Sequence, residues 1–310
     1  MIFDGNVAVI DVQSDSVICL LNTGNTPAEV GVVENLDRAY VADLTDGTVT
    51  VVNTADFSVV DVIVLANPVA AIGVDQATQT VYALDFSNGV PGTDLHMINA
   101  NTNLEINTLP VGNRTQNIAV SSAENRAYVS DFVDGLVVVD TDAVSVETIL
   151  PMTGLPHGVA VDESTGRLYV TLLESDSVVI FDTATLTMTD VLTVGDVPQW
   201  IALDPPRNKA FITNEGDGTV SVIDISTNTV HPAAIPVGPG PLTLTVHTGQ
   251  AKAYVYNTGD NTISVIDTVS ETVIATIGLI FSDGFESGDT SAWSPASVEA
   301  DGRPVSLHSP

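Results

Sequence analysis

A tyrosine or phenylalanine recurs at a nearly constant interval, and this periodicity is the strongest constraint on the fold of the chain. The six aromatic residues are 41 to 46 positions apart: Tyr40, Tyr82, Tyr128, Tyr169, Phe211 and Tyr254. An Asp or Asn that ends a short apolar segment repeats in the same register: Asp11, Asn53, Asn99, Asp140, Asp182, Asp224 and Asp267. Such a period indicates one supersecondary unit copied along the chain. We therefore expect seven repeat units, the first of them incomplete.

Each unit has the composition of four β-strands. In the unit at 196–238, short segments rich in Val, Ile and Thr are bounded by Gly, Pro, Asn or Asp, which is typical of strands joined by turns. Asp-Gly pairs at 46–47, 134–135 and 217–218 suit the positive φ angles of tight hairpins. Radial repetition protects the sheet edges of such units. The sequence predicts an all-β, seven-bladed β-propeller of four-stranded antiparallel blades, with the first blade incomplete at the N-terminus.

The predicted propeller covers residues 1–279 and is followed by an acidic, polar tail at 280–310 that we expect to be partly disordered. A half blade at 1–24 precedes six repeats, at about 25–66, 67–112, 113–154, 155–195, 196–238 and 239–279. The half blade has sequence for the third and fourth strands only. We expect a truncated chain start, or a half blade that is closed by a tail strand or shared with another chain. An open sheet edge there favours self-association.

Short motifs within the repeats resemble a known family. The segments Tyr-Val-Ala-Asp at 40–43, Tyr-Val-Ser-Asp at 128–131 and Phe-Ile-Thr-Asn at 211–214, with Thr-Val-Ser-Val-Ile-Asp at 219–224, resemble the YVTN family of β-propeller repeats. The resemblance covers residues 1 to about 279. It implies a bacterial-type extracytoplasmic protein, periplasmic, cell-surface or secreted, with a binding or unassigned role. The wider group includes lactonases. The N-terminus lacks a signal-peptide pattern, as expected if the start is truncated.

The charge of the chain narrows the range of partners. The chain has 8 Lys and Arg against 39 Asp and Glu, which gives a formal net charge of −31. This balance opposes binding to nucleic acid and docking on anionic lipid. No apolar stretch reaches the roughly 20 residues that a membrane-spanning helix needs, so membrane insertion is not expected. Cationic peptides and uncharged ligands remain compatible partners.

Candidate binding residues lie where the innermost strand of each repeat begins, at the predicted mouth of the central channel. The two positions after the Pro position of the repeat vary between units, and their polar and aromatic members are Glu29, Gln116, Asn117, His157, Gln199 and Trp200. One acid, one imidazole, three amides and one indole suit a small polar ligand, a sugar or a peptide end. The alternative is that they are polar caps on a water-filled channel.

The sequence predicts no catalytic residue and no cofactor, although two metal hypotheses remain open. A metal-dependent lactonase needs acids and amides around a divalent cation, and Glu29, Asn117 and His157 come nearest to such a set. Neither a Gly-x-Ser-x-Gly elbow nor a P-loop is present.

Repeated acids and amides at strand ends raise the second metal hypothesis, a weak Ca²⁺ site. These residues are Asp43, Asp85, Asp131, Asn214 and Asn257. Their spacing does not form an Asp-x-Asp-x-Asp-Gly loop, and side chains that close turns explain them sufficiently. Five cations, each two residues before the repeat aromatic, should ring one face beside neighbouring carboxylates: Arg38, Arg126, Arg167, Lys209 and Lys252.

The first hypothesis is a non-enzymatic, secreted or cell-surface propeller that binds a protein, peptide or carbohydrate through one channel-mouth face. The alternatives are a metal-dependent lactonase-like hydrolase and a purely structural repeat scaffold. The sequence does not identify the ligand.

Overall fold

The structure is a computed structural model that describes residues 2–3, 6–86 and 92–279, and the expectations for the tail at 280–310 lie outside this range. The chain divides into one unit at Met1–Gly278 and a second at Leu279–Pro310. No helix among the described residues is long and apolar enough to cross a membrane.

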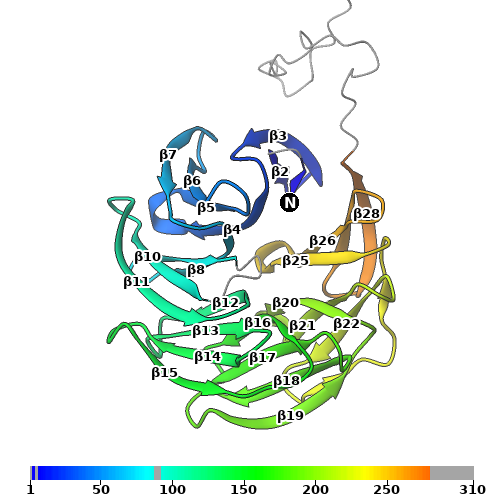
Figure 1. The fold of residues 1–310 in the computed structure, drawn as a ribbon. Coiled ribbons are helices and arrows are strands. Elements are labelled where there is room, and N and C mark those ends of the chain that lie inside the picture. The colour runs from blue at the N-terminus through cyan, green and yellow to red at the C-terminus, as the bar shows by residue number, and fades with distance from the viewer. Residues whose placement is uncertain (1, 4–5, 87–91, 280–310) are drawn as a thin grey trace, which may run out of the picture. The chain divides into compact units, whose positions relative to one another are not determined.

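Six four-stranded antiparallel blades follow one another around a common centre (Figure 1). We name them blades A to F in chain order. Blades A to C consist of β4 (Pro27–Val33), β5 (Arg38–Asp43), β6 (Thr48–Asn53) and β7 (Val59–Val64); β8 (Val69–Asp75), β9 (Thr80–Asp85), β10 (Thr93–Asn99) and β11 (Leu104–Gly112); and β12 (Thr115–Ser121), β13 (Arg126–Asp131), β14 (Gly135–Asp140) and β15 (Ser145–Leu150). The innermost strands of successive blades contact one another, from β4 and β8 onward.

Blades D to F continue the same order. They consist of β16 (Pro156–Asp162), β17 (Arg167–Leu172), β18 (Ser177–Asp182) and β19 (Thr187–Thr193); β20 (Pro198–Asp204), β21 (Lys209–Asn214), β22 (Thr219–Asp224), β23 (Thr229–Val230) and β24 (Ile235–Pro236); and β25 (Pro241–His247), β26 (Lys252–Asn257), β27 (Thr262–Asp267) and β28 (Thr272–Gly278). In blade E the outer strand is split, and both β23 and β24 pair with β22. Pro232 lies between these two pieces, and proline cannot donate a hydrogen bond to the sheet.

The predicted number of seven blades is wrong, because the structure has six. The sheet at the N-terminus consists of β2 (Asn6–Asp11) and β3 (Ser16–Asn22), with only the two residues of β1 (Ile2–Phe3) beside β2. We call it the N-terminal sheet. Asp11 of the Asp/Asn series ends β2, which corresponds to the third strand of a blade, and among the described residues only the two residues of β1 lie where a second strand would be. The Asp/Asn series therefore has seven members, although the structure has six blades.

The hairpin turns have the predicted conformation. Gly47, Gly135 and Gly218 have positive φ angles of 64°, 103° and 66°. Three 3₁₀ turns join first and second strands: η1 (Glu34–Leu36), η2 (Pro205–Arg207) and η3 (Thr248–Gln250). Each ends on a residue in the left-handed region, namely Asp37, Asn208 and Ala251.

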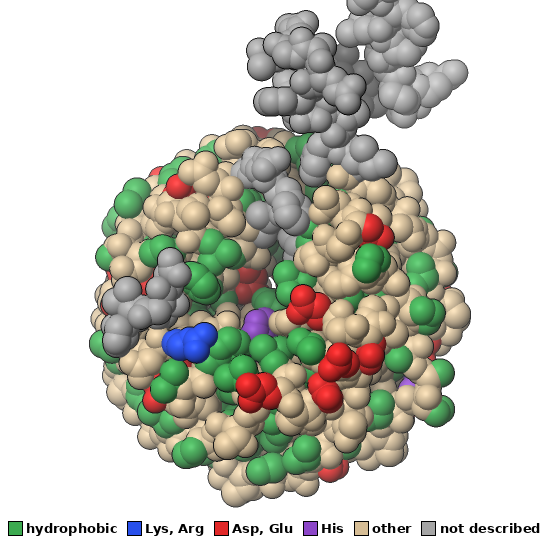
Figure 2. Space-filling view, turned by 45° about the vertical axis from the view of Figure 1, so that its right-hand side comes forward, with side chains coloured by type: hydrophobic (Ala, Val, Ile, Leu, Met, Phe, Trp, Pro, Cys, Tyr) green, Lys and Arg blue, Asp and Glu red, His purple; other side chains and the backbone are tan. Residues whose placement is uncertain are grey.

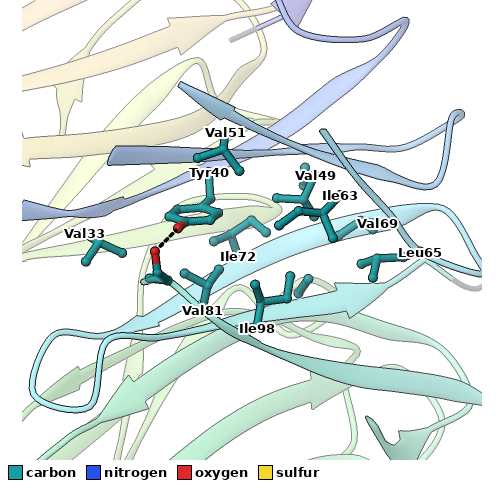
Figure 3. Packing of buried hydrophobic residues seen from close by; sticks show 13 residues of the cluster. Val33, Tyr40, Val49, Val51, Ile63, Leu65, Val69, Ile72, Val81 and Ile98 are labelled. Carbon is teal, nitrogen blue, oxygen red and sulfur yellow. Dashed lines mark hydrogen bonds between the residues drawn. The ribbon is translucent and has the colours of Figure 1, made fainter. Parts of the chain in front are cut away.

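The hydrophobic core lies between adjacent blades. Five clusters of buried side chains each join one blade to the next. Between blades A and B, Tyr40 packs among Val51, Ile72 and Val81, and its hydroxyl donates to the Ala100 carbonyl at 3.1 Å (Figure 3). The repeat aromatic is thus the side chain that connects its own blade to the following one.

The five repeated cations also join neighbouring blades. Each donates from the second strand of its blade to a carbonyl just after the third strand of the next sheet: Arg38 to Ala100, Arg126 to Thr183, Arg167 to Ile225, Lys209 to Thr268 and Lys252 to Val12. Ion pairs with carboxylates are present as well, such as Arg126 with Glu147 at 2.6 Å. The expected ring of cations is therefore a set of contacts between sheets. Its last member attaches blade F to the N-terminal sheet.

Candidate functional site

A β-bulge at the start of each innermost strand presents the candidate binding residues. The strand register shifts directly after the Pro position in all six blades, between the following pairs: Pro27 and Val30, Val69 and Ala71, Thr115 and Asn117, Pro156 and Val159, Pro198 and Ile201, and Pro241 and Leu244. A bulge frees residues from the ladder and redirects their side chains. The sequence-predicted residues are thus the irregular residues of otherwise regular blades.

The amides at these bulges have different surroundings. The Gln116 side chain donates to its own backbone neighbours, the Arg114 and Thr115 carbonyls, each at 2.9 Å. Gln199 is buried and donates to Glu215. Asn117 is buried, and its side-chain Nδ2 has no hydrogen-bond partner. Within the described chain, Asn117 is the site amide with an unused donor.

A row of ring systems crosses blades C, D and E. The Arg114 guanidinium lies 5.3 Å from the ring centre of Phe132, which lies 6.1 Å from that of His157. The His157 and Trp200 rings meet edge to face at 6.2 Å, a favourable geometry for aromatic pairs. Burial lowers the pKa of His157, although its hydrogen bond to the Gln199 carbonyl opposes this shift. The imidazole is therefore neutral at pH 7.

Glu29 of blade A is the one acid among the candidate residues. Its carboxylate accepts the backbone N–H of Ile72 in blade B at 3.0 Å. Burial raises the pKa of Glu29 to about 8, although this hydrogen bond works in the opposite direction. Glu29 is therefore mostly protonated at pH 7, and it contributes no full charge to the site.

Glu29 and Trp200 line the same pocket, which has a volume of about 490 Å³. Its other lining residues come from the N-terminal sheet and from blades A and F, and most are apolar: Ala8, Ile10, Val12, Ala28, Val30, Val32, Thr243, Leu244, Thr245, Val246, His247, Tyr254, Tyr256 and Ile263. Hydrophobic side chains gather around the central hollow, with acidic side chains scattered around them (Figure 2). Gln116, Asn117, His157 and Gln199 do not line the pocket.

The residues suggested for a lactonase-like metal site are not joined to one another. Over the described residues, no hydrogen bond or ion pair links any two of Glu29, Asn117 and His157, and no group of three or more His, Cys, Asp or Glu side chains could hold a metal ion. The Glu29 carboxylate already accepts a backbone N–H, and the His157 Nδ1 already contacts a carbonyl. These contacts do not resemble the donor set of a divalent cation.

The acids at the second-strand ends close turns. Asp43 is fully buried and accepts the backbone N–H groups of Thr26, Thr45 and Asp46 at 2.8, 2.9 and 2.7 Å. A Cβ added to Gly24 would lie 2.1 Å from the Asp43 Oδ2, so glycine is required where the chain passes this carboxylate. Asp131 makes the equivalent contacts in blade C.

A buried charge network in blade B was missed by the sequence analysis. His96 is 3% exposed and lies between Asp85 at 3.0 Å and Glu105 at 2.7 Å. Burial alone would lower the pKa of His96, but its two carboxylate partners raise it to about 9. The available signal was a histidine on a third strand, at a position where the other blades have Val, Ser or Thr.

This network predicts a pH dependence of stability. Because the folded pKa of His96 exceeds the unfolded value of about 6.5, its contribution is complete below about pH 6.5 and is lost as the pH rises through about 9. We expect a loss of about 3 kcal/mol of unfolding free energy over this interval. Urea unfolding at several pH values measures it. His96→Gln should flatten the profile, because it removes the titrating imidazole. An unaltered profile in His96→Gln would contradict this assignment.

Comparisons with known proteins support the fold and do not identify a family. No protein-family model matches the chain, and no curated protein matches it. Kuenenia stuttgartiensis hydrazine synthase has a similar structure, with a TM-score of 0.74 and 15% identity over 85% of this chain and 90% of that one. A protein of unknown function from Desulfotomaculum acetoxidans gives 0.75 and 13%, over 89% and 93%.

Two further similar structures belong to proteins with other roles. Dihydro-heme d1 dehydrogenase NirN, solved in complex with DHE, gives a TM-score of 0.68 and 13% identity over 90% of this chain and 62% of that one. A chain of the mitotic checkpoint complex gives 0.72 and 14%, over 82% and 79%. At such low identities these similarities show the β-propeller fold alone. The same fold occurs in enzymes and in protein complexes, so it does not indicate a function.

Proposed function

We propose that this protein is a non-enzymatic binding propeller whose ligand is an uncharged, largely apolar segment of a peptide or protein. The observation that carries the proposal is the pocket beside Glu29 and Trp200, in which aliphatic side chains predominate. The net charge of the chain is −31, yet the bulge residues next to the pocket are neutral. An uncharged pocket on a strongly acidic protein selects against small ionic ligands.

The side chains in the pocket favour a peptide over a sugar. Ile10, Val30, Val32 and Ile263 supply aliphatic surface, and the Trp200 indole supplies a flat aromatic surface. Apolar peptide side chains can bury themselves against such surfaces, and buried aromatic residues often dominate binding energies. The protonated Glu29 can donate a hydrogen bond to a peptide carbonyl. Binding of a carbohydrate is the competing outcome of the experiment below.

The proposed role agrees with the YVTN-type repeat motifs, whose resemblance implies a bacterial-type protein in an extracytoplasmic location. We propose that the protein acts outside the cytoplasm, at the cell surface or after secretion. The hydrolase alternative has no specific observation in its favour, because the side chains of Glu29, Asn117 and His157 do not hydrogen-bond to one another in the described chain.

Trp200→Ala is expected to weaken ligand binding by about 10- to 30-fold, since truncation of a central aromatic contact costs about 2 kcal/mol. The measurement starts with selection of a displayed random peptide library on the wild-type protein. Affinities of the enriched peptides are then determined for the wild type and for Trp200→Ala by isothermal titration calorimetry. A glycan array is screened in parallel.

The matched control is Trp293→Phe, which changes the other tryptophan of the chain and should leave the affinity unchanged. Enriched peptides that bind Trp200→Ala as tightly as the wild type would contradict the proposed site. If glycans bind and no peptide does, the ligand is a carbohydrate and not a peptide. No enrichment by either library would favour a purely structural scaffold.

A further inference from the structure

One valine on the innermost strand of blade A is exposed where its equivalents are buried. Val30 is 41% exposed. It pairs with Val41, the residue directly after the repeat aromatic, and the residues in the same register in blades B to F are Ile72 at 5%, Ile118 at 5%, Val159 at 6%, Ile201 at 3% and Leu244 at 4%. In those blades the preceding blade covers this side chain. Blade A is preceded by the N-terminal sheet, which leaves Val30 uncovered.

The N-terminal sheet itself has an open edge. Among the described residues, β1 pairs with β2 only through Asn6 and Val7, so the edge from Ala8 to Asp11 has no strand beside it. In blade C, by contrast, the second strand pairs with all six residues of the third strand. The inner residues of β2, at 7–10, are all partly exposed, whereas the four central residues of the third strands of blades A to F are buried.

The N-terminal sheet is held in place by blade F. The Lys252 ammonium donates to the Val12 carbonyl at 2.9 Å and pairs with Asp15 at 2.7 Å, and the Tyr254 hydroxyl donates to Asp15 at 2.9 Å. These contacts repeat those of Arg38 and Tyr40 with Ala100 and Asn103 between blades A and B. The open edge is therefore presented in a fixed position.

Blade A also carries an unused acceptor. The carbonyl after its third strand belongs to Thr54, and the equivalent carbonyls of five other sheets accept a Lys or Arg from the preceding blade. No Lys or Arg in the described part of the chain donates to the Thr54 carbonyl. The uncovered valine, the open edge and this acceptor all lie around the same gap between the N-terminal sheet and blade A.

We propose that this gap binds an extended β-strand of a partner polypeptide with the pattern basic, small, aromatic, β-branched. This inference rests on the proposed peptide-binding function and names the ligand class. The strand adds to the open edge of β2 by main-chain hydrogen bonds. Its aromatic side chain covers Val30, as Phe211 packs on the following blade, and its β-branched side chain points to the opposite face, as Ile212 does. Its Lys or Arg donates to Thr54. The pattern is that of the second strands of this chain, such as Lys209-Ala210-Phe211-Ile212, which occupy the equivalent place beside the third strands of complete blades.

A synthetic peptide with the sequence of residues 205–217 tests the proposal, because it contains such a strand with its flanks. We expect it to bind the full chain with a dissociation constant in the micromolar range and to raise the melting temperature by mass action. Val30→Asp should weaken binding by about 10-fold or more, since it places a charge against the apolar strand. The matched control is Val133→Asp, which changes another exposed valine, on blade C, and should bind normally. If Val30→Asp does not fold, Val30→Thr replaces it as the test variant, because threonine has nearly the same shape as valine but carries a hydroxyl.

Three results would overturn the proposal: no binding at about 1 mM peptide, equal binding to wild type and Val30→Asp, or equal binding of a peptide with Phe211→Ser. A concentration-dependent dimer that is abolished by Val30→Asp would assign the gap to a second copy of the chain. Tighter peptide binding after removal of residues 280–310 would assign it to the chain itself. Library peptides that depend on Trp200 and not on Val30 would leave the binding function intact while rejecting this strand site.

Discussion

Asp43→Ala is expected to lower the free energy of unfolding by about 3 kcal/mol, because it leaves several buried donors without an acceptor. Asp43 is fully buried, and its carboxylate receives backbone N–H groups from the turns on both sides, together with the Thr45 hydroxyl at 3.1 Å. Guanidinium unfolding of wild type and variant measures the difference. A loss below about 1 kcal/mol, the scale of an ordinary exposed hydrogen bond, would contradict the assigned role of this carboxylate.

Asp43→Asn is the matched control, since Asn214 and Asn257 occupy the same repeat position in blades E and F. It should cost less than Asp43→Ala, because one side-chain oxygen still accepts. Burial alone would raise the pKa of Asp43, but hydrogen bonds from Asp46, Thr26 and Thr45 outweigh it and lower the pKa. The contribution of Asp43 is therefore present above the unfolded value near 4 and is lost as the pH falls through the lower folded value. The difference between wild type and Asp43→Asn should shrink in acid.

Phe211→Ala is expected to lower the free energy of unfolding by about 4 kcal/mol, the cost of a large cavity in a packed core. Phe211 is fully buried and packs with Val222, Leu244 and Val255 at the junction of blades E and F. Because the variant loosens one blade junction, the measurement is denaturant unfolding followed by circular dichroism. A cost below about 1.5 kcal/mol, typical of a well-tolerated swap, would mean that the repeat aromatic does not hold the blades together.

Phe211→Tyr provides the control for this prediction. Tyrosine occupies the same repeat position in the other blades, and the hydroxyl of Tyr40 reaches an acceptor in the next blade. We expect Phe211→Tyr to change stability by less than about 1 kcal/mol. A loss as large as that of Phe211→Ala would indicate that the junction of blades E and F differs from the other junctions.

The periodic residues allowed the blade architecture to be predicted from the sequence. The aromatic series repeats because this side chain packs each blade against the next one, so a single unit reveals the whole array. The predicted number of blades was wrong because the Asp/Asn series also marks the incomplete N-terminal sheet. A periodic position shows that one strand exists and does not show that its neighbours do.

The candidate site was less accessible to sequence reasoning. The bulge positions could be located because Pro precedes them, and Glu29 and Trp200 share one pocket. The other wall of that pocket is formed by β2 and by the first strand of blade F, with residue types that are ordinary for the repeats. Their exposure depends on which neighbouring strands are present. The charges of Glu29 and His157 likewise depend on burial, which a sequence does not contain.

The most direct test of the proposed binding function is a fluorescence titration of Trp200. Trp293→Phe leaves Trp200 as the only tryptophan of the chain, and library-selected peptides are added to this variant. If Trp200 contacts the peptide, its emission should shift to the blue in a saturable way, because the half-buried indole becomes enclosed by apolar groups. The dissociation constant should equal that from calorimetry. Peptide binding seen by calorimetry without any change in Trp200 emission would contradict the proposed site.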